Sequence, residues 1–408
     1  MFVLDRTKRY IKRVGSDSKR KLKKLVMAAP FWVLLASVLL LSIGSIRAAV
    51  ITEDRFDTRM NTVWSQGGSD YRHVAVYAGG ARTGGAGSPL RYVDPETSIK
   101  RTDLSTIRTS LQGAADAVNT STNKRGLNTD GSPNNWEDCW SSCLTGDVYT
   151  VAPSDNPSAP VKQAECDIVA VGGNFKAFHP FEYMSGGFLP EICTDPQLIV
   201  VNDVLAWRFF NSYDVVGFKV SLWGKVYTIA GVVAEPNSSM DKKADTDVSR
   251  AYVYFSTLEA EFLEDGAEDV AIQCYEAFLP EAVKGVAVND MKTALPNYSS
   301  EDPKMLVVSV TGRLFFTKVW QSVIPIGNSE VPDGIELPYW ERAARIATEH
   351  LFVDLVLIIL GIILLIIGII MVVLKIRKYS PGDSPAEEDA GDEDDDGPET
   401  PGDLENMK

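Results

Sequence analysis

Two groups of acidic side chains come nearest, by type and spacing, to general acid–base chemistry. Asp241 and Asp245 lie four residues apart, and the second group consists of Glu259, Glu261 and Glu264. Paired carboxylates can relay a proton when one member is held protonated. Both groups stand in polar stretches, so we expect solvated surface residues. No Ser, His and Asp order with a nucleophile elbow occurs in the sequence, and we do not expect an enzyme.

The five cysteines and three histidines offer little for a metal or redox centre. Cys139 and Cys143, in the segment CWSSC, lack the spacing of zinc and thioredoxin-type motifs, so we expect either a local disulfide or simple burial. An odd number of cysteines leaves at least one thiol free. The segment GGARTGGAGSP lacks the Lys-Ser/Thr ending of a phosphate-binding loop, and no Walker A sequence occurs elsewhere. We expect neither a metal nor a bound cofactor in this chain.

Two long apolar runs lie near the ends of the chain. Residues 351–374, LFVDLVLIILGIILLIIGIIMVVL, would extend about 36 Å as a helix, which exceeds a hydrocarbon core of about 30 Å. Residues 25–46 form the second run, LVMAAPFWVLLASVLLLSIGSI. Both are predicted to be transmembrane helices. The alternative for the first run is a cleaved signal peptide, because a basic segment precedes it.

The charge distribution predicts which side of the membrane each part occupies. Residues 1–24 carry ten Lys or Arg against two Asp, and Lys375, Arg377 and Lys378 follow the second run. Positive charge beside a span marks the cytoplasmic side. We therefore expect both termini in the cytoplasm and residues 47–350 outside the cell membrane. The acidic balance of the remaining chain argues against a nucleic-acid partner.

The two terminal segments carry opposite charge. Residues 1–24 can form an amphipathic helix on the inner membrane face, with Arg9, Lys12 and Arg13 contacting lipid headgroups or a cytoplasmic partner. They can equally act as a charge anchor that sets the topology. Residues 375–408 are rich in Asp and Glu and are predicted to be a disordered cytoplasmic tail.

Three residues of the second apolar run are candidates for a role inside the membrane. Asp354 is the one charged residue of the run, and it is either functional or near enough to the outer boundary to reach water. Gly361 and Gly368 lie seven residues apart on one helical face, where they would let another helix approach closely. The alternative is that glycine is merely common in spans.

Helical patterns continue from both spans into the outer segment. Apolar residues recur at roughly helical spacing after Ile46, which predicts a stalk helix over 47–66. The segment PYWERAARIATEH runs without a breaker into the second span, with Pro338 at a first helical position, and predicts a second stalk over 331–350. The candidate transmission residues of this stalk are Pro338, Trp340, Arg342 and Arg345.

Between the stalks, the chain is predicted to fold as α+β. Residues 67–171 contain strand, helix and strand patterns in that order, and the same order recurs over 271–330. Residues 172–270 are mostly of β character with one short helix. We therefore expect one mixed α/β subdomain made from both ends of the segment, with a mainly β subdomain inserted between them.

The inserted region resembles a known family. The stretches GGNFKAFHPFEYMSGGFLPE and LIVVNDVLAWRFFNSYDVVGFKVSLWGKVYTIAGVV resemble the extracytoplasmic core domain of MacB-like permeases, in the FtsX-like family of ABC transporters. The strand CYEAFLP and the helix PYWERAAR look like versions found in Gram-positive bacteria. The likeness runs in order from about residue 5 to 375 and is specific between about 165 and 280. It implies a porter-like subdomain built from both chain ends and an inserted, mainly β subdomain.

The resemblance implies a function in transport. The chain would be the membrane subunit of an ABC assembly that passes ATPase-driven movement of its membrane helices to the outer domain, for an amphiphile, peptide or cell-envelope partner. ATP would be bound by a separate ATPase subunit, beside a second permease subunit or in a homo- or hetero-oligomer. Family permeases continue into two further spans, whereas this sequence ends in the acidic tail. The alternative is a non-transporting, membrane-anchored binding or scaffold protein that reuses the domain.

Overall fold

The computed structural model describes most of the chain between residues 28 and 379. The described residues are 28–65, 71–80, 98–118, 135–152, 158, 160–245, 247–264, 269–301, 304–325 and 330–379. Two compact units are present. Leu41–Ile359 form the larger unit, which contains the sheet, and the segments up to Leu40 and from Leu360 onward form the other.

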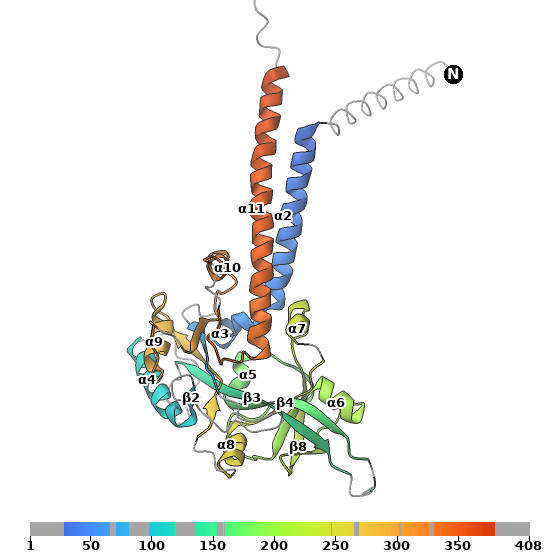
Figure 1. Ribbon diagram of the computed structural model, residues 1–408, viewed down its shortest axis with the longest axis vertical. Helices are drawn as coiled ribbons and strands as arrows, with labels where there is room; N and C mark the ends of the chain where they lie inside the picture. The colour runs from blue at the N-terminus through green and yellow to red at the C-terminus, as the bar shows by residue number, and fades with distance from the viewer. Residues whose placement is uncertain are drawn as a thin grey trace, which may run out of the picture. The chain divides into compact units, whose positions relative to one another are not determined.

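Ten strands of the described residues form one sheet in the larger unit (Figure 1). The strands of the two outer halves lie together, in the order β12 (Leu306–Ser309), β1 (Tyr71–Tyr77), β11 (Cys274–Pro280), β3 (Glu137–Thr150) and β4 (Gln163–Gly173). The strands of the insert follow, in the order β9 (Arg250–Tyr254), β6 (Leu198–Asn202), β8 (Lys225–Ala234) and β5 (Glu182–Gly186). β7 (Lys219–Leu222) pairs with β3 and β8. A separate pair consists of β2 (Ile99–Lys100) and β10 (Ala271–Ile272).

A parallel strand pair joins the two predicted parts of the domain. β4 pairs with β9 from Asp167 opposite Arg250 to Val171 opposite Tyr254. The pairs β1–β11, β11–β3 and β3–β4 are antiparallel. Sequence order thus separates the insert from the outer halves, while hydrogen bonding makes them one sheet. The α+β class with two long apolar helices is confirmed.

Helices cover both faces of this sheet. One apolar cluster contains Val74 and Val76 of β1 together with side chains of four helices, α4 (Leu104–Ala117), α6 (Asp203–Phe210), α8 (Phe255–Glu264) and α9 (Val286–Ala294). A second cluster contains Ala75 and Tyr77 with α3 (Met60–Trp64), α5 (Phe175–Phe178) and the start of α11 (Tyr339–Tyr379). β1 sends alternate side chains to opposite faces, as its sequence predicts.

The first predicted stalk, over 47–66, is not one helix. α2 runs over Ala29–Asp54 and ends there, and Arg55 has φ −91° and ψ 56°, outside the helical region. A 3₁₀ turn, η1 (Phe56–Arg59), and the short α3 follow. The guanidinium of Arg55 turns into the domain and pairs with carboxylates there. This tertiary pairing outweighs the local helical pattern, so the prediction was wrong beyond Asp54.

The second predicted stalk is shorter than expected and helical only from Tyr339. Residues 330–338 are not helical. The carbonyl of Pro338 accepts the N–H groups of Glu341 and Arg342, so Pro338 precedes the first helical residue rather than occupying it. From Tyr339 the helix α11 continues to Tyr379 without a break.

α2 and α11 are long and apolar enough to cross a membrane, by length and composition. Only 17% of the most apolar stretch of α2 and 11% of that of α11 is buried. A helix in the core of a soluble protein would be mostly covered, so their apolar side chains need another apolar surrounding.

Candidate functional site

The described residues gather buried charges where the first turns of α11 meet the sheet. We call this group the helix-foot network and define it as Arg55, Asp57, Asp241, Arg313 and Glu341. Arg55 precedes η1 and Asp57 lies within it, Asp241 belongs to α7 (Ser239–Ala244), Arg313 follows β12 and Glu341 lies in the first turn of α11. The network therefore joins both long helices to the domain.

Glu341 is the centre of one half of the network. Its side chain is 1% exposed. Arg313 pairs with both carboxylate oxygens, Nη1 to Oε2 at 2.6 Å and Nη2 to Oε1 at 3.1 Å. Arg345 Nε adds a bond at 3.0 Å, and the Tyr77 hydroxyl donates at 3.1 Å. Burial alone would raise the pKa of Glu341, but the positive charge of Arg313 and its hydrogen bonds lower this pKa below its usual value.

Arg55 is the centre of the other half. It is 2% exposed, and its Nη1 lies 2.8 Å from Oδ1 of Asp241. Nη2 pairs with Asp57 and donates to the main-chain carbonyl of Trp340 at 3.1 Å. Burial raises the pKa of Asp57, and the nearby Arg55 opposes that rise. The end of α2 is thereby connected to the first turn of α11.

Asp241 reaches Arg55 because α7 is capped. Ser238 at the N-cap accepts the N–H groups of Met240 and Asp241, and Oδ2 of Asp241 accepts the N–H of Ser238 in return. This capping box leaves Oδ1 for Arg55. Asp241 is 7% exposed, so the expectation that it is a solvated surface residue was wrong. Long-range pairing with a buried cation is the physical reason.

A second buried cluster lies beside the network and contains two of the three histidines. Both oxygens of Glu276 on β11 contact imidazole nitrogens: Oε1 lies 3.1 Å from Nε2 of His73, and Oε2 lies 2.6 Å from Nε2 of His179. Burial would raise the pKa of Glu276, but the charge of His179 and the hydrogen bonds of both rings outweigh it and lower the pKa strongly. His179 also packs on the Trp340 ring, with centroids 4.4 Å apart.

Cys139 completes a group that could in principle hold a metal ion. Ligand atoms of Cys139, His179 and Glu276 lie within 4.8 Å of one another. Around tetrahedral zinc, ligand atoms about 2.0 to 2.3 Å from the ion stand more than about 3 Å from each other. Nε2 of His179 and Oε2 of Glu276 are 2.6 Å apart, a hydrogen-bond distance. This distance fits a hydrogen-bonded His179–Glu276 pair better than two ligands of one metal ion. The expectation that the chain holds no metal stays a prediction.

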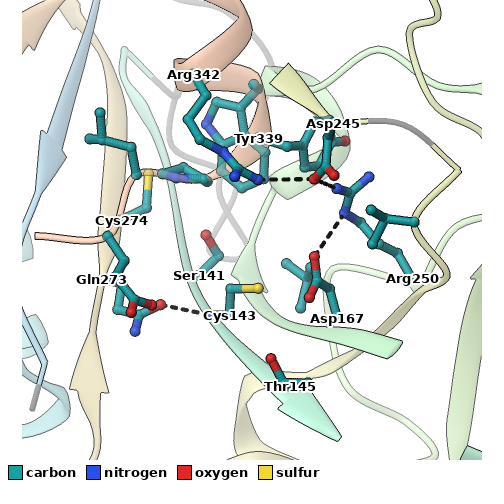
Figure 2. A pocket seen from close by; sticks show the side chains of 16 residues that line it. Ser141, Cys143, Thr145, Asp167, Asp245, Arg250, Gln273, Cys274, Tyr339 and Arg342 are labelled. Carbon is teal, nitrogen blue, oxygen red and sulfur yellow. Dashed lines mark hydrogen bonds and ion pairs between the residues drawn. The ribbon is translucent and has the colours of Figure 1, made fainter. Parts of the chain in front are cut away.

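A cavity of about 510 Å³ opens beside the start of α11. Figure 2 shows how its charged side chains lie: Arg342 of α11 points at Asp245, and Arg250 lies between Asp245 and Asp167. Arg342 Nη2 is 2.9 Å from Asp245 Oδ2. The Arg250 guanidinium carbon lies 4.1 Å from the centre of the Tyr339 ring, in a cation–π contact. These contacts link the predicted transmission residue Arg342 to the insert.

The other predicted transmission residues lie at the same place. Trp340 is 9% exposed and packs on Phe175, with ring centroids 5.8 Å apart. Arg345 donates a hydrogen bond to Glu341, and the carbonyl of Pro338 accepts the first main-chain hydrogen bonds of α11. The structure thus brings all four predicted residues of 331–350 to the foot of the helix, though their role in transmission stays a prediction.

Asp354 pairs with a residue of the other long helix. It is fully buried, and Oδ1 lies 2.9 Å from Nε of Arg47 on α2. Gly44 of α2, which no sequence pattern had marked, faces the same turn: a Cβ on it would lie 3.0 Å from the carbonyl oxygen of Asp354. Within the larger unit, the two helices therefore meet at a glycine and an ion pair.

The predicted glycines are both buried in the smaller unit. A Cβ on Gly368 would lie 2.6 Å from Cδ2 of Leu34, so this glycine permits close approach of α2. The role of Gly361 in helix packing stays a prediction. Arg9, Lys12 and Arg13 lie outside the described residues.

Of the two alternatives expected for Cys139 and Cys143, the local disulfide is wrong: Cys139 is buried and Cys143 is half-buried, and they are not bridged. No disulfide joins any of the five cysteines, all of which the structure describes. Both residues lie on β3, where four residues of strand extend about 13 Å, and a disulfide requires Cα atoms within about 7 Å. Strand geometry therefore keeps the two sulfurs apart.

Sequence reasoning missed most of the helix-foot network and the neighbouring cluster around Glu276. Glu276 carried a signal, because it is a single charge inside the otherwise uncharged strand CYEAFLP. Arg55 and Arg313 had none, since each lies in a stretch with other polar residues and finds its partners far along the chain.

No family model matches the sequence, and no curated protein matches it. Several solved structures are similar, among them the following three. The periplasmic region of MacB from Actinobacillus actinomycetemcomitans has 12% identity and a TM-score of 0.35, over 59% of this chain and 89% of that one. The extracellular domain of the noncanonic ABC-type transporter YknZ from Gram-positive bacteria has 11% identity and a TM-score of 0.36, over 58% and 100%. A permease domain from Porphyromonas gingivalis has 12% identity and a TM-score of 0.29, over 58% and 88%. With TM-scores this low, these likenesses do not establish a function for the chain.

Proposed function

We propose that this chain is a membrane subunit of an ABC transporter assembly of the MacB-like and FtsX-like kind. In this proposal α2 and α11 cross the cell membrane, both termini are cytoplasmic, and the sheet domain stands outside. A separate ABC ATPase supplies ATP hydrolysis, because this sequence has no Walker A motif. Movement of the helices is passed to the outer domain, which handles an amphiphile, a peptide or a cell-envelope partner. A Gram-positive source is part of the same proposal.

The helix-foot network is the observation that carries this proposal. Glu341 in the first turn of α11 is bound to Arg313 beside β12, and Arg55 at the end of α2 is bound to α7 and to the carbonyl of Trp340. These are buried, charge-assisted contacts, which are shorter and stronger than hydrogen bonds between neutral groups. A displacement of either helix at this level therefore has to move the elements to which it is bonded.

The break at Arg55 gives the two helices different roles. α11 enters the domain core as one helix from Tyr339, whereas α2 ends at Asp54 and continues through a 3₁₀ turn. A continuous helix passes on a tilt that an irregular turn can absorb. We therefore assign the transmission of movement chiefly to α11, with α2 held beside it through Arg47 and Asp354.

Recovery of a partner ATPase tests the proposal. The full chain, tagged and purified from the membranes of its native cell, is expected to bring with it a subunit that hydrolyses ATP. Replacing Arg9, Lys12 and Arg13 together by Gln should weaken this recovery, because these residues are the proposed cytoplasmic contact. A matched variant with Gln at Lys19, Arg20 and Lys21 removes the same charge and should retain the ATPase.

The alternative is an anchored binding or scaffold protein that does not transport. A chain that purifies alone, from cells that contain ABC ATPases, would favour this alternative and contradict the transporter assignment. Equal loss of the ATPase in both Gln variants would show that only overall charge matters at this segment.

A further inference from the structure

The short helix α10 (Phe316–Val323) is unusual because it turns large apolar side chains outward. Phe315 is 72% exposed, Phe316 56%, Ile324 43% and Trp320 37%. Val319, within the same helix, is 3% exposed and is its one buried residue. Exposed aromatic side chains of this density mark a surface that is covered by something apolar.

The packing contacts of α10 show which part of α11 it lies beside. Val319 lies in an apolar cluster with Ile51 of α2 and with Ala347 and Leu351 of α11. The Trp320 ring contacts that of Phe352, with centroids 5.6 Å apart. Leu351 and Phe352 begin the apolar run of α11, so α10 lies at the level where that run starts. Figure 1 shows α10 beside α11, off the sheet.

The arrangement fits a helix at a membrane surface. Trp is enriched at the boundary between hydrocarbon and headgroups, because its ring is apolar and its N–H is polar. Interfacial helices insert an apolar face about 5 to 10 Å into the boundary region, and their opposite face carries cations. Lys318 of α10 is exposed and provides such a cation.

We infer that α10 is an interfacial anchor, with Phe315, Phe316 and Trp320 inserted into the outer leaflet beside α11. The occupant of this surface is lipid, because the patch is continuous with the exposed apolar side chains at the start of the α11 run, such as Val353. This inference rests on the proposed crossing of the membrane by α11. Arg313, which binds Glu341, lies three residues before Phe316, so lipid around α10 would be linked to the helix-foot network.

Site-specific fluorescence of the full chain in lipid nanodiscs tests this inference. Cys193 is the one exposed thiol among the described cysteines and lies with Ser256 and Glu259 of α8 in another cavity of the domain. In a C143S background, Cys193 labelled with an environment-sensitive dye is the reference. In a C143S/C193S background, F316C carries the same dye, and I363C, in the apolar run of α11, reports the span.

Lipids with a quencher near the headgroup should quench the dye at position 316 severalfold more than at Cys193, and aqueous iodide should do the reverse. Equal iodide quenching at 316 and 193 would overturn the interfacial anchor. Protection at 316 from both quenchers would also overturn it, because a protein would then cover α10. Position 363 lies near the middle of the span, so it is probed with lipids that carry the quencher deep in the acyl chain. Lipid quenching at 363 with none at 316 rejects this inference alone, whereas iodide quenching at 363 rejects the membrane crossing as well.

Discussion

Arg313 and Glu341 form a two-pronged ion pair at the foot of α11, with Nη1 2.6 Å from Oε2 and Nη2 3.1 Å from Oε1. The carboxylate comes from the first turn of α11, and the guanidinium comes from the turn that follows β12. Because the side chain of Glu341 is 1% exposed, water cannot replace either partner. The pair therefore ties the helix to the sheet, and its removal has measurable consequences.

Replacing Glu341 by Gln should destabilise the outer domain strongly. The change leaves the charge of Arg313 without its main partner in a buried place, for which we expect a loss of about 3 to 5 kcal/mol in the free energy of unfolding. Denaturant titration of the full chain in detergent measures it. Glu349 lies two turns further along α11 and is exposed, so E349Q serves as the control and should change stability by less than about 0.5 kcal/mol. Equal effects of the two variants would contradict a special role for the pair.

Glu137 at the start of β3 should make stability fall as pH rises. Burial raises its pKa to about 7, although hydrogen bonds from Asn174 and Trp64 oppose the rise. In the unfolded chain the pKa is about 4.3, so between about 4.3 and 7 the folded state binds the extra proton. Its contribution to stability is complete below the lower value and is lost as pH approaches 7.

The variant E137Q carries no titrating group at this position. It should therefore gain stability over the wild type as pH rises from about 4 to 7, and the difference should level off above 7. Unfolding midpoints across this pH range measure the gain. Parallel profiles for the two proteins would show that Glu137 binds protons equally in the folded and unfolded chain.

The ion pair between Arg47 and Asp354 should hold α2 against α11 near the start of the apolar run. Reversing one charge, as in R47D or D354R, should lower the melting temperature, because two like charges then face each other. The double variant R47D/D354R restores opposite charges and should recover most of the loss, with a coupling energy of about 1 kcal/mol for a pair that is half exposed on one side. Additive losses in the double variant would mean that the two side chains do not interact.

Gly44 should tolerate no side chain. A Cβ there would lie 2.9 Å from Cγ1 of Ile358 and 3.0 Å from the carbonyl oxygen of Asp354, and the main chain cannot move aside cheaply. We expect G44A to cost about 1 to 3 kcal/mol through overpacking. Gly113 in α4 is the control, since a Cβ added there would meet no atom within 4 Å. G113A should be stabilising by up to about 1 kcal/mol, as alanine favours helices. A neutral G44A would contradict the close approach of the two helices.

The positions of the strands and helices followed largely from local patterns. The strand, helix and strand patterns expected over 67–171 correspond to β1, α4 and β3. Such patterns repeat within a few residues, so they can be recognised without knowing the fold. The return of the strand, helix and strand order over 271–330 likewise matched β11, α9 and β12.

The candidate site depended on partners far apart in the chain. Arg55 finds Asp241 across 186 residues, and His73 finds Glu276 across 203. No repeating pattern of neighbouring residues indicates such pairs, because they form only once folding has brought β1, β11 and α7 together. The break at Arg55 is the clearest case, since its local pattern favoured a helix and its buried ion pairs did not.

The amino-acid sequence by itself determined that the chain has two membrane-length apolar helices, an α+β segment between them and terminal segments of opposite charge. These properties depend on composition and on apolar patterns that repeat every few residues, and neither depends on how the elements are arranged in space. Only the tertiary structure decided that the insert shares one sheet with the outer halves, that α2 ends at Asp54 and that α10 presents its aromatic residues beside α11. Each of these results depends on which side chains, far apart in the sequence, come into contact. A buried charge or aromatic ring affects the stability of the fold only once those contacts have formed.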